Sequence, residues 1–192
     1  MRIFLAGATG VIGQRLLPLL MSNGHQVAGM TRTESKTSEI TRAGAHAVLC
    51  DVFDTTRLFR AIEDFRPDVV WHLLTDLPDD YSLLGRYGPA NNRIRREGTA
   101  NLLKATDLVE AKMIAQSVAW QLPGDGGYAV AYLENAVQEA EGVVIRYGQL
   151  YGPGTYYELD PPGHPRIHVA DAPSLSLQAL EMETGMLTVK ED

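Results

Sequence analysis

The opening stretch of the chain, MRIFLAGATGVIGQRLLPLL, constrains the fold most strongly, because a strand, a glycine turn and a helix are predicted there in direct succession. An apolar run over Arg2–Ala6 is long enough for a buried strand, and Gly7, Gly10 and Gly13 follow at three-residue spacing. In such a turn the first glycine permits a sharp reversal, the second lets the backbone approach a pyrophosphate, and the third lets the helix pack close to the strand. This order predicts a nucleotide-binding turn, with an ordinary tight strand-to-helix turn as the alternative.

The unpaired N–H groups at the start of the predicted helix supply the chemistry of this turn, because they can donate hydrogen bonds to the phosphates of a dinucleotide. A second strand is predicted over His25–Met30, at the distance expected for a strand–helix–strand unit. We therefore expect a set of cofactor contacts at the turn, which comprises Gly7, Thr9, Gly10, Val11, Ile12 and Gly13.

Arg32 lies just past the second predicted strand and bears on which nicotinamide cofactor is bound. An acidic side chain at that strand end would bind the ribose 2′-hydroxyl of NAD, whereas an arginine would accommodate the 2′-phosphate of NADP. Arg32 therefore favours NADP. Alternatively, Arg32 is a solvated surface residue. Because Glu34 follows two residues later, NAD remains an alternative cofactor.

Asp51 and Val52 close the third predicted strand, His46–Cys50. A carboxylate at the carboxyl end of a parallel strand lies where ligands bind, so Asp51 could accept a hydrogen bond from an adenine amino group. Alternatively, Asp51 only begins the turn before a helix that Asp54 caps. Cys50 is the single cysteine, and we expect it to be a core residue without chemistry of its own.

Strands and helices alternate along the rest of the chain. Further strands are predicted over 68–74, 112–117 and 142–147, and further helices over 55–65, 91–109 and 128–140. The alternation predicts an α/β fold, a doubly wound parallel sheet with helices on both faces. Irregular loops are expected over 76–90 and 148–154, at the carboxyl edge of the sheet. His72 is expected to be a hydrogen-bonded core histidine.

The chain is predicted to hold one dinucleotide-binding domain, residues 1–155, and a short C-terminal segment, 156–192, that packs on the same domain. Within that segment we expect a helix at 174–182 and a last strand at 186–189. A hydrophobic content of 45% in 192 residues is enough for a core of ordinary size.

Charge and hydropathy argue against two classes of partner. Seventeen basic against 24 acidic residues give a net charge of -7, which argues against a nucleic-acid surface. Apolar runs fall short of the roughly 20 residues of a membrane span, and no signal-peptide pattern is found. We therefore expect a cytoplasmic protein that binds neither nucleic acid nor a membrane, and we predict no metal site.

Several motifs of the chain follow one another in a characteristic order: GATGVIG, Asp51-Val52, DVVWHLL, REGTANLLKAT, AQSVAW, VVIRYGQLYGPGT and HVADA. Together they resemble the extended, epimerase-like short-chain dehydrogenase/reductase superfamily, and within it the atypical epimerase-related bacterial proteins. The resemblance implies a Rossmann fold that binds NAD or NADP, with Gly7, Gly10, Gly13 and Asp51 at cofactor positions. Further cofactor contacts are expected at strand ends, at Val52, Leu74, Tyr147 and Gly148.

The resemblance is incomplete at the catalytic positions. The family uses a tyrosine as acid or base, a lysine four residues later and a serine or threonine that orients the substrate oxygen, and Ser117 matches the last. Aligning Glu134 with the family's glutamate places the tyrosine and lysine positions on Gly126 and Val130. A shifted register would use Tyr128 as a makeshift proton donor. Losing acid–base assistance forfeits roughly 10²- to 10⁴-fold in rate.

Two functions follow as hypotheses. The first is an NADP-dependent, or alternatively NAD-dependent, oxidoreductase or epimerase that acts on a small carbonyl or sugar-type substrate. The second is a dinucleotide-binding sensor or scaffold without redox chemistry. The resemblance also implies a homodimer through helices 91–109 and 128–140, and the short region after YGPG implies a substrate pocket that is shallow or completed by a partner subunit.

Overall fold

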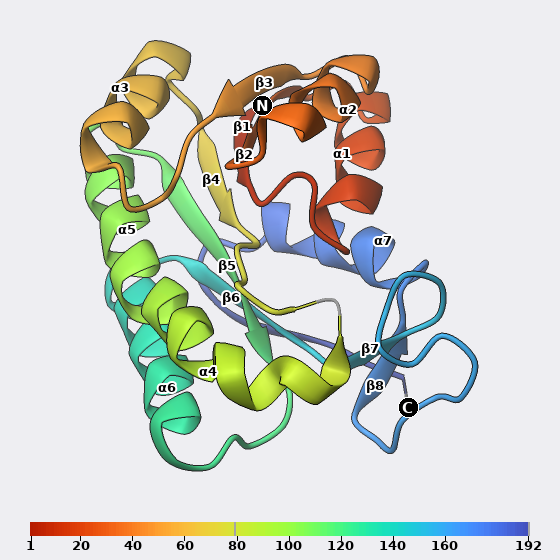
Figure 1. The fold of residues 1–192 in the computed structure, drawn as a ribbon. Helices are drawn as coiled ribbons and strands as arrows, with labels where there is room; N and C mark the ends of the chain where they lie inside the picture. Colours follow the sequence, from red (N-terminus) through yellow and green to blue (C-terminus); the bar gives the residue numbers. More distant parts are fainter. Residues whose placement is uncertain (79, 192) are drawn as a thin grey trace.

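Seven parallel strands form one sheet in the computed structural model, which describes residues 1–78 and 80–191. Their order across the sheet is β3-β2-β1-β4-β5-β6-β9 (Figure 1). The strands are β1 (Arg2–Ala6), β2 (Gln26–Thr31), β3 (His46–Leu49), β4 (Val69–His72), β5 (Lys112–Val118), β6 (Val143–Tyr147) and β9 (Gly185–Val189). The chain runs outward from β1 to β3 and then crosses to β4 on the other side of β1. This reversal is the switch point where α/β sheets bind ligands.

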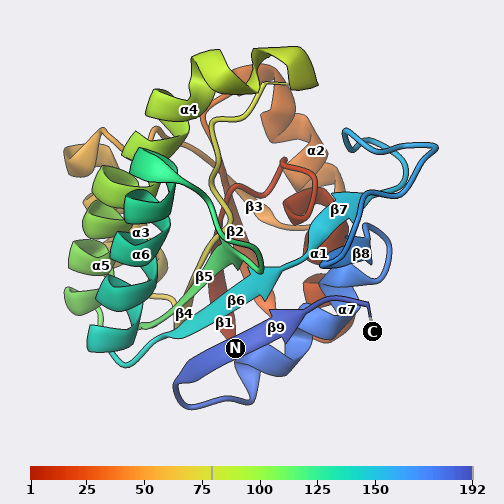
Figure 2. The same cartoon turned by 90° about the horizontal axis from the view of Figure 1, so that it is seen from below.

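Helices cover both faces of the sheet, as Figure 2 shows. One face carries α1 (Gly13–Ser22), α2 (Thr37–Arg42) and α7 (Ala172–Ser176). The other carries α3 (Thr55–Phe65), α4 (Leu84–Arg93), α5 (Thr99–Asp107) and α6 (Gly124–Glu139). A π-helical segment, Ile94–Gly98, joins α4 to α5. The predicted Rossmann-type doubly wound fold is thus confirmed.

Two hydrophobic cores lie between these layers, and the alternation of strand residues decides which side chain enters which core. Ile3 and Leu5 of β1 pack on the face covered by α1. Phe4 and Ala6 pack on the opposite face, in the cluster that includes Leu58 of α3. Because both faces of β1 are buried, its sequence is a continuous apolar run.

The two predicted loops, 76–90 and 148–154, are irregular only in part, and each contains regular structure that was not predicted. Residues 81–90 are helical, with a short 3₁₀ turn at Tyr81–Leu83 followed by α4. This helix contains two glycines and Pro89 and buries only two asparagines, so local propensity does not favour it, and its packing against α6 holds it in place. In the second loop, β7 (Gln149–Tyr151) pairs in parallel with β8 (Arg166–His168).

The C-terminal part of the chain contributes to both the sheet and the core. The predicted last strand is found as β9, which pairs in parallel with β6. The predicted helix begins two residues early as α7 and continues as a 3₁₀ turn at Leu177–Leu180. Ala172 and Ala179 join the core on the α1 face. None of the helices in the described ranges has the length and apolar character that crossing a bilayer requires.

Candidate functional site

The glycine turn between β1 and α1 lies at the carboxyl edge of the sheet, beside the chain that leaves β4 (Figure 1). Gly7 has φ 92°, and a Cβ there would lie 2.9 Å from the carbonyl carbon of Leu73. A Cβ on Gly13 would lie 2.1 Å from the carbonyl oxygen of Gly7. At Gly10, in contrast, a Cβ would meet only the Gly7 oxygen, at 3.4 Å. The first and third glycines are therefore required by the fold, whereas the second leaves an exposed approach to bare backbone.

Four backbone amides in this turn are available to a ligand. Within the described residues, the N–H groups of Thr9, Val11, Ile12 and Gly13 donate to no protein acceptor. Gly10 N donates to Gly7 O at 3.1 Å, which fixes the shape of the turn. Unbonded amides at the start of a ten-residue helix match the donors that a diphosphate needs, so these residues fit a dinucleotide.

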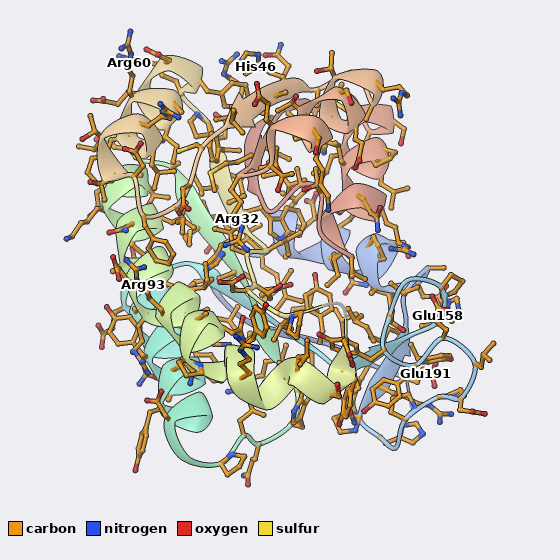
Figure 3. The ribbon with its side chains drawn as sticks, in the orientation of Figure 1. Arg32, His46, Arg60, Arg93, Glu158 and Glu191 are labelled. Carbon is orange, nitrogen blue, oxygen red and sulfur yellow. The ribbon has the colours of Figure 1, made fainter. Side chains whose placement is uncertain are left out.

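Arg32 lies directly after β2, and its partner comes from a distant part of the chain. Its Nη2 donates to Asp76 Oδ1 at 2.6 Å, and the two side chains are 54% and 22% exposed. The hydrogen bond with Asp76 raises the pKa of Arg32, and the charge of Asp51 adds to this effect. Figure 3 shows Arg32 lying between β2 and α4. Sequence reasoning missed Asp76, which becomes a neighbour only because β2 and β4 flank β1.

Asp51 forms the turn that the sequence left as an alternative. Its Oδ1 accepts a hydrogen bond from Phe53 N at 2.9 Å, and Asp54 caps α3 by accepting one from Arg57 N at 3.1 Å. The Asp51 side chain is nevertheless exposed, so a contact with adenine stays a prediction. Val52 is buried, and its carbonyl accepts a hydrogen bond from Asn101 Nδ2 at 3.0 Å.

Ser117 lies at the end of β5 and is part of a hydrogen-bonded group with the buried Glu134 of α6 and the partly exposed Arg146 of β6. Ser117 Oγ donates to Glu134 Oε1 at 2.5 Å. Arg146 donates to the same carboxylate through Nε at 2.8 Å and through Nη2 at 2.5 Å. Burial would raise the pKa of Glu134, but the hydrogen bonds from Arg146 and Ser117 outweigh it and hold that pKa below its ordinary value. The Ser117 proton therefore points toward a carboxylate that is ionised at neutral pH.

Tyr128 is not brought together with Ser117. Tyr128 is 76% exposed and, six residues before the buried Glu134, lies on a different face of α6, so the geometry does not support the makeshift proton donor expected from the sequence. Gly126 and Val130 precede Glu134 by eight and four residues and so share its helix face. Neither the glycine nor the valine has an ionisable group.

Two groups at strand ends are held uncharged by burial. His72 Nδ1 accepts a hydrogen bond from Leu74 N at 3.2 Å, so its proton sits on Nε2, which lies 3.2 Å from Thr99 Oγ1. Burial, together with the charge of Arg95, lowers the pKa of His72 to about 4. His72 is thus a core histidine, as predicted. Burial also raises the pKa of the Cys50 thiol to about 11, which leaves it unreactive.

Tyr147 and Gly148 are positioned by packing. The Tyr147 side chain is 3% exposed in the core on the α1 face, and its hydroxyl lies 2.7 Å from Ser176 Oγ. At Gly148 a Cβ would lie 2.7 Å from the backbone of Arg166, so glycine is required where β8 passes. The Tyr147 side chain is therefore not available to a cofactor, and only backbone contacts at 147–148 stay predicted. Leu74 is partly buried beside the turn.

Comparisons with known proteins agree with this geometry. The family profile described as "NAD dependent epimerase/dehydratase family" matches residues 3–120. A relative from a Streptomyces species, described as a 3-diazoavenalumate denitrifying reductase, is 33% identical over 243 aligned positions that cover 100% of this chain and 76% of the relative.

Solved structures with the same fold include NAD complexes. UDP-glucose 4-epimerase from Thermus thermophilus, in complex with NAD, has a TM-score of 0.80 at 18% identity, with 99% of this chain and 78% of that chain covered. The Bordetella bronchiseptica enzyme WbmG, also in complex with NAD, has a TM-score of 0.77 at 18% identity, with 99% and 72% covered. At these identities the likeness concerns the fold.

Proposed function

Because the chain belongs to the NAD-dependent epimerase/dehydratase family, we propose that it is a nicotinamide-dependent reductase whose substrate needs no proton from the enzyme. The observation that carries this proposal is the hydrogen bond from Ser117 to the ionised Glu134, on a helix whose positions 126 and 130 are glycine and valine. When bound, the dinucleotide would supply a hydride. The chain's own residues determine which acceptors can use it.

We propose NADP as the cofactor, with NAD as the alternative. Arg32 uses only Nη2 in its bond to Asp76, so Nε and Nη1 have no partner in the described part of the chain and remain free to donate to a 2′-phosphate. Asp76 and Asp51 partly offset this attraction, since both carboxylates would repel a phosphate. The four unbonded amides of the turn would hold the diphosphate of either cofactor.

A carbonyl substrate fits this site poorly. Its reduction creates an alkoxide that a nearby acid must protonate. Ser117 already donates its hydrogen bond to Glu134, and Arg146 keeps Glu134 ionised. Positions 126 and 130 carry no acid, and the neutral His72 is fully buried. A carbonyl reductase built this way would forgo roughly 10²- to 10⁴-fold of assistance.

A diazo substrate removes that requirement. The name of the Streptomyces relative states a diazo substrate and a reduction that removes nitrogen. For a diazonium group the overall change is R–N≡N⁺ plus H⁻ giving R–H plus dinitrogen, which balances in atoms and charge without an added proton. We infer that this chain reduces a small compound of this class.

The test compares two acceptors of similar shape, 4-carboxybenzenediazonium and 4-carboxybenzaldehyde, in the presence of NADPH. We expect protein-dependent loss of NADPH and matching release of dinitrogen with the diazonium ion, and little turnover of the aldehyde. The background control is Gly10→Glu, which places a carboxylate at the exposed approach to the turn without a clash. Preferential aldehyde reduction would refute the proposal.

A non-catalytic sensor is the second candidate, and the absent acid favours it as well. It predicts that the protein binds NADPH but turns over neither acceptor. Calorimetry with NADPH, alongside the turnover assay, separates the two functions.

We also propose a homodimer. Tyr128 and Tyr132 lie four residues apart on α6 and are 76% and 43% exposed, and Leu108 just past α5 is 52% exposed. These apolar side chains support an interface on this helical layer. Analytical ultracentrifugation of wild type and Tyr132→Glu tests it, with dissociation expected for the variant.

A further inference from the structure

Arg95 is an unpaired cation in the helix that covers the carboxyl end of β4. Two neighbouring arginines have partners, since Arg93 Nε donates to Glu97 at 2.6 Å and Arg96 Nη1 donates to Asp125 at 2.9 Å. Arg95 is partly buried, yet it forms no hydrogen bond or ion pair with any residue that the structure describes. Figure 3 shows Arg93 on the outer side of this layer.

Arg95 lies near the end of β4. It lies in the π-helical segment Ile94–Gly98, whose two end residues are buried. One turn later, Thr99 Oγ1 lies 3.2 Å from His72 Nε2 at the end of β4, and the charge of Arg95 contributes to the low pKa of His72. A π-helical turn of this kind often occurs at functional sites.

This position adjoins the glycine turn. The residue after His72, Leu73, contacts Gly7 closely enough that a Cβ on that glycine would lie 2.9 Å from the Leu73 carbonyl. Arg95 therefore sits across the end of β4 from the four unbonded amides, on the side of the sheet covered by α5. Those amides lie at the start of α1, on the opposite face.

A guanidinium that is partly removed from water and has no counter-ion is costly, and burial indeed lowers the pKa of Arg95. A planar oxyanion would supply the missing partner, because a guanidinium binds a carboxylate through two parallel hydrogen bonds. The cofactor's diphosphate already has donors at α1. A second oxyanion in the site would belong to the substrate.

We propose that Arg95 binds an oxyanion, and specifically a carboxylate of the substrate, and so positions the substrate at the end of β4. This inference rests on the proposed reductase function. It identifies the substrate as a carboxylate-bearing compound and assigns the residue that selects it.

The test measures binding of benzoate and of uncharged benzamide by calorimetry, to protein with and without NADP. Arg95→Met removes the charge at similar length, and Arg95→Lys keeps the charge but loses the paired N–H donors of the guanidinium. Arg86→Met, at an exposed arginine of α4, is the matched control. We expect Arg95→Met to lower the affinity for benzoate about 10- to 100-fold, the range of charge-assisted hydrogen bonds. Arg95→Lys should have an affinity between those of wild type and Arg95→Met. Binding of benzamide and of NADPH should be unchanged.

Three results would overturn the assignment: wild type that does not bind benzoate, equal benzoate binding by wild type and Arg95→Met, or loss of NADPH binding alone in Arg95→Met. The last result would identify the oxyanion as the cofactor's phosphate. Failure of wild type to bind NADPH would instead contradict the proposed function, and the benzoate measurement without cofactor would still decide the role of Arg95. A thermal unfolding midpoint recorded for each variant confirms that it is folded.

Discussion

The hydroxyl of Ser117 donates a hydrogen bond to Glu134 across 2.5 Å, so the residue expected to orient a substrate oxygen is hydrogen-bonded to a carboxylate instead. Arg146 holds that carboxylate from the other side. The proposed function, in which the substrate accepts a hydride without a proton from the enzyme, rests on this arrangement, and the first prediction tests it by adding an acid.

Placing a tyrosine and a lysine at positions 126 and 130 should create carbonyl reductase activity. Gly126 and Val130 share the helix face of Glu134, and a Cβ at Gly126 would meet only the Leu122 side chain, at 3.6 Å. We expect Gly126→Tyr with Val130→Lys to raise kcat/KM for 4-carboxybenzaldehyde by up to about 10²- to 10⁴-fold. The control, Gly126→Phe with Val130→Lys, lacks the phenol and should gain nothing. Equal gains in both double variants would show that the acid is not what the site lacks.

Removing the charge of Glu134 should destabilise the fold, because Arg146 and Ser117 would lose a charged acceptor. We expect Glu134→Gln to lower the free energy of unfolding by about 1–3 kcal/mol near neutral pH. The pKa of Glu134 is lower in the folded protein, so this advantage is present above its unfolded pKa and is lost as the pH falls through the folded pKa. Urea unfolding should show the two proteins converging in acid, and a pH-independent difference would contradict this account.

His72 should make stability fall in mild acid. Its pKa is lowered from 6.5 to about 4, so the unfolded chain takes up a proton at a higher pH than the folded protein does. The free energy of unfolding therefore begins to fall near the unfolded pKa and stops falling near the folded pKa. Between about pH 7 and pH 5 we expect this residue to cost about 2 kcal/mol. His72→Gln should flatten that part of the curve of unfolding free energy against pH. An equally steep curve would mean that His72 is not the titrating group.

Arg32 and Asp76 should act in opposite directions on cofactor choice. We expect Arg32→Ala to lower the affinity for NADPH about 10- to 100-fold and to change the affinity for NADH little, because only NADPH has the 2′-phosphate. Asp76→Asn removes the competing carboxylate 2.6 Å away and should strengthen NADPH binding by about 1.5- to 5-fold, as expected for an exposed ion pair. Fluorescence titration with both cofactors measures this. Equal losses for NADH and NADPH in Arg32→Ala would exclude a phosphate contact.

Arg95 should lower the stability of the fold while it supports the binding of substrate. Replacing a partly buried, unpaired guanidinium by an apolar side chain of similar length removes a desolvation cost, so we expect Arg95→Met to raise the free energy of unfolding by about 1 kcal/mol. Arg86→Met, in the exposed control position, should change it little. Chemical denaturation of the cofactor-free proteins provides the comparison, and a less stable Arg95→Met would show that Arg95 has a structural partner.

The sequence predicted an element well where the residues within and next to that element determine its structure. The helix Thr55–Phe65 was predicted with its observed bounds, because Asp54 caps its start and Pro67 follows its end. The buried strands could be recognised because both faces of a parallel sheet are apolar. In contrast, α4 is held by packing on α6, and β7 pairs with a strand more than a dozen residues away, so neither has a local signal.

The candidate site was harder to predict for the same reason. Three consecutive elements place the glycine turn, and their order is visible in the sequence. The partner of Arg32 is 44 residues away, and Glu134 is 12 residues from Arg146. Such pairs depend on the order of strands in the sheet and on helix rotation, which periodicity does not specify. The exposure of Tyr128 is likewise a matter of helix rotation.

Calorimetric titration of NADPH into wild type, Gly10→Glu and Gly163→Glu tests the dinucleotide site most directly. Gly10 lies among the four unbonded amides, whereas Gly163 is exposed elsewhere and has no neighbour within 4 Å of a Cβ. We predict that wild type and Gly163→Glu bind NADPH alike and that Gly10→Glu loses at least about 10-fold in affinity, through repulsion of the diphosphate. Equal binding by all three proteins, or no binding by wild type, would contradict the account.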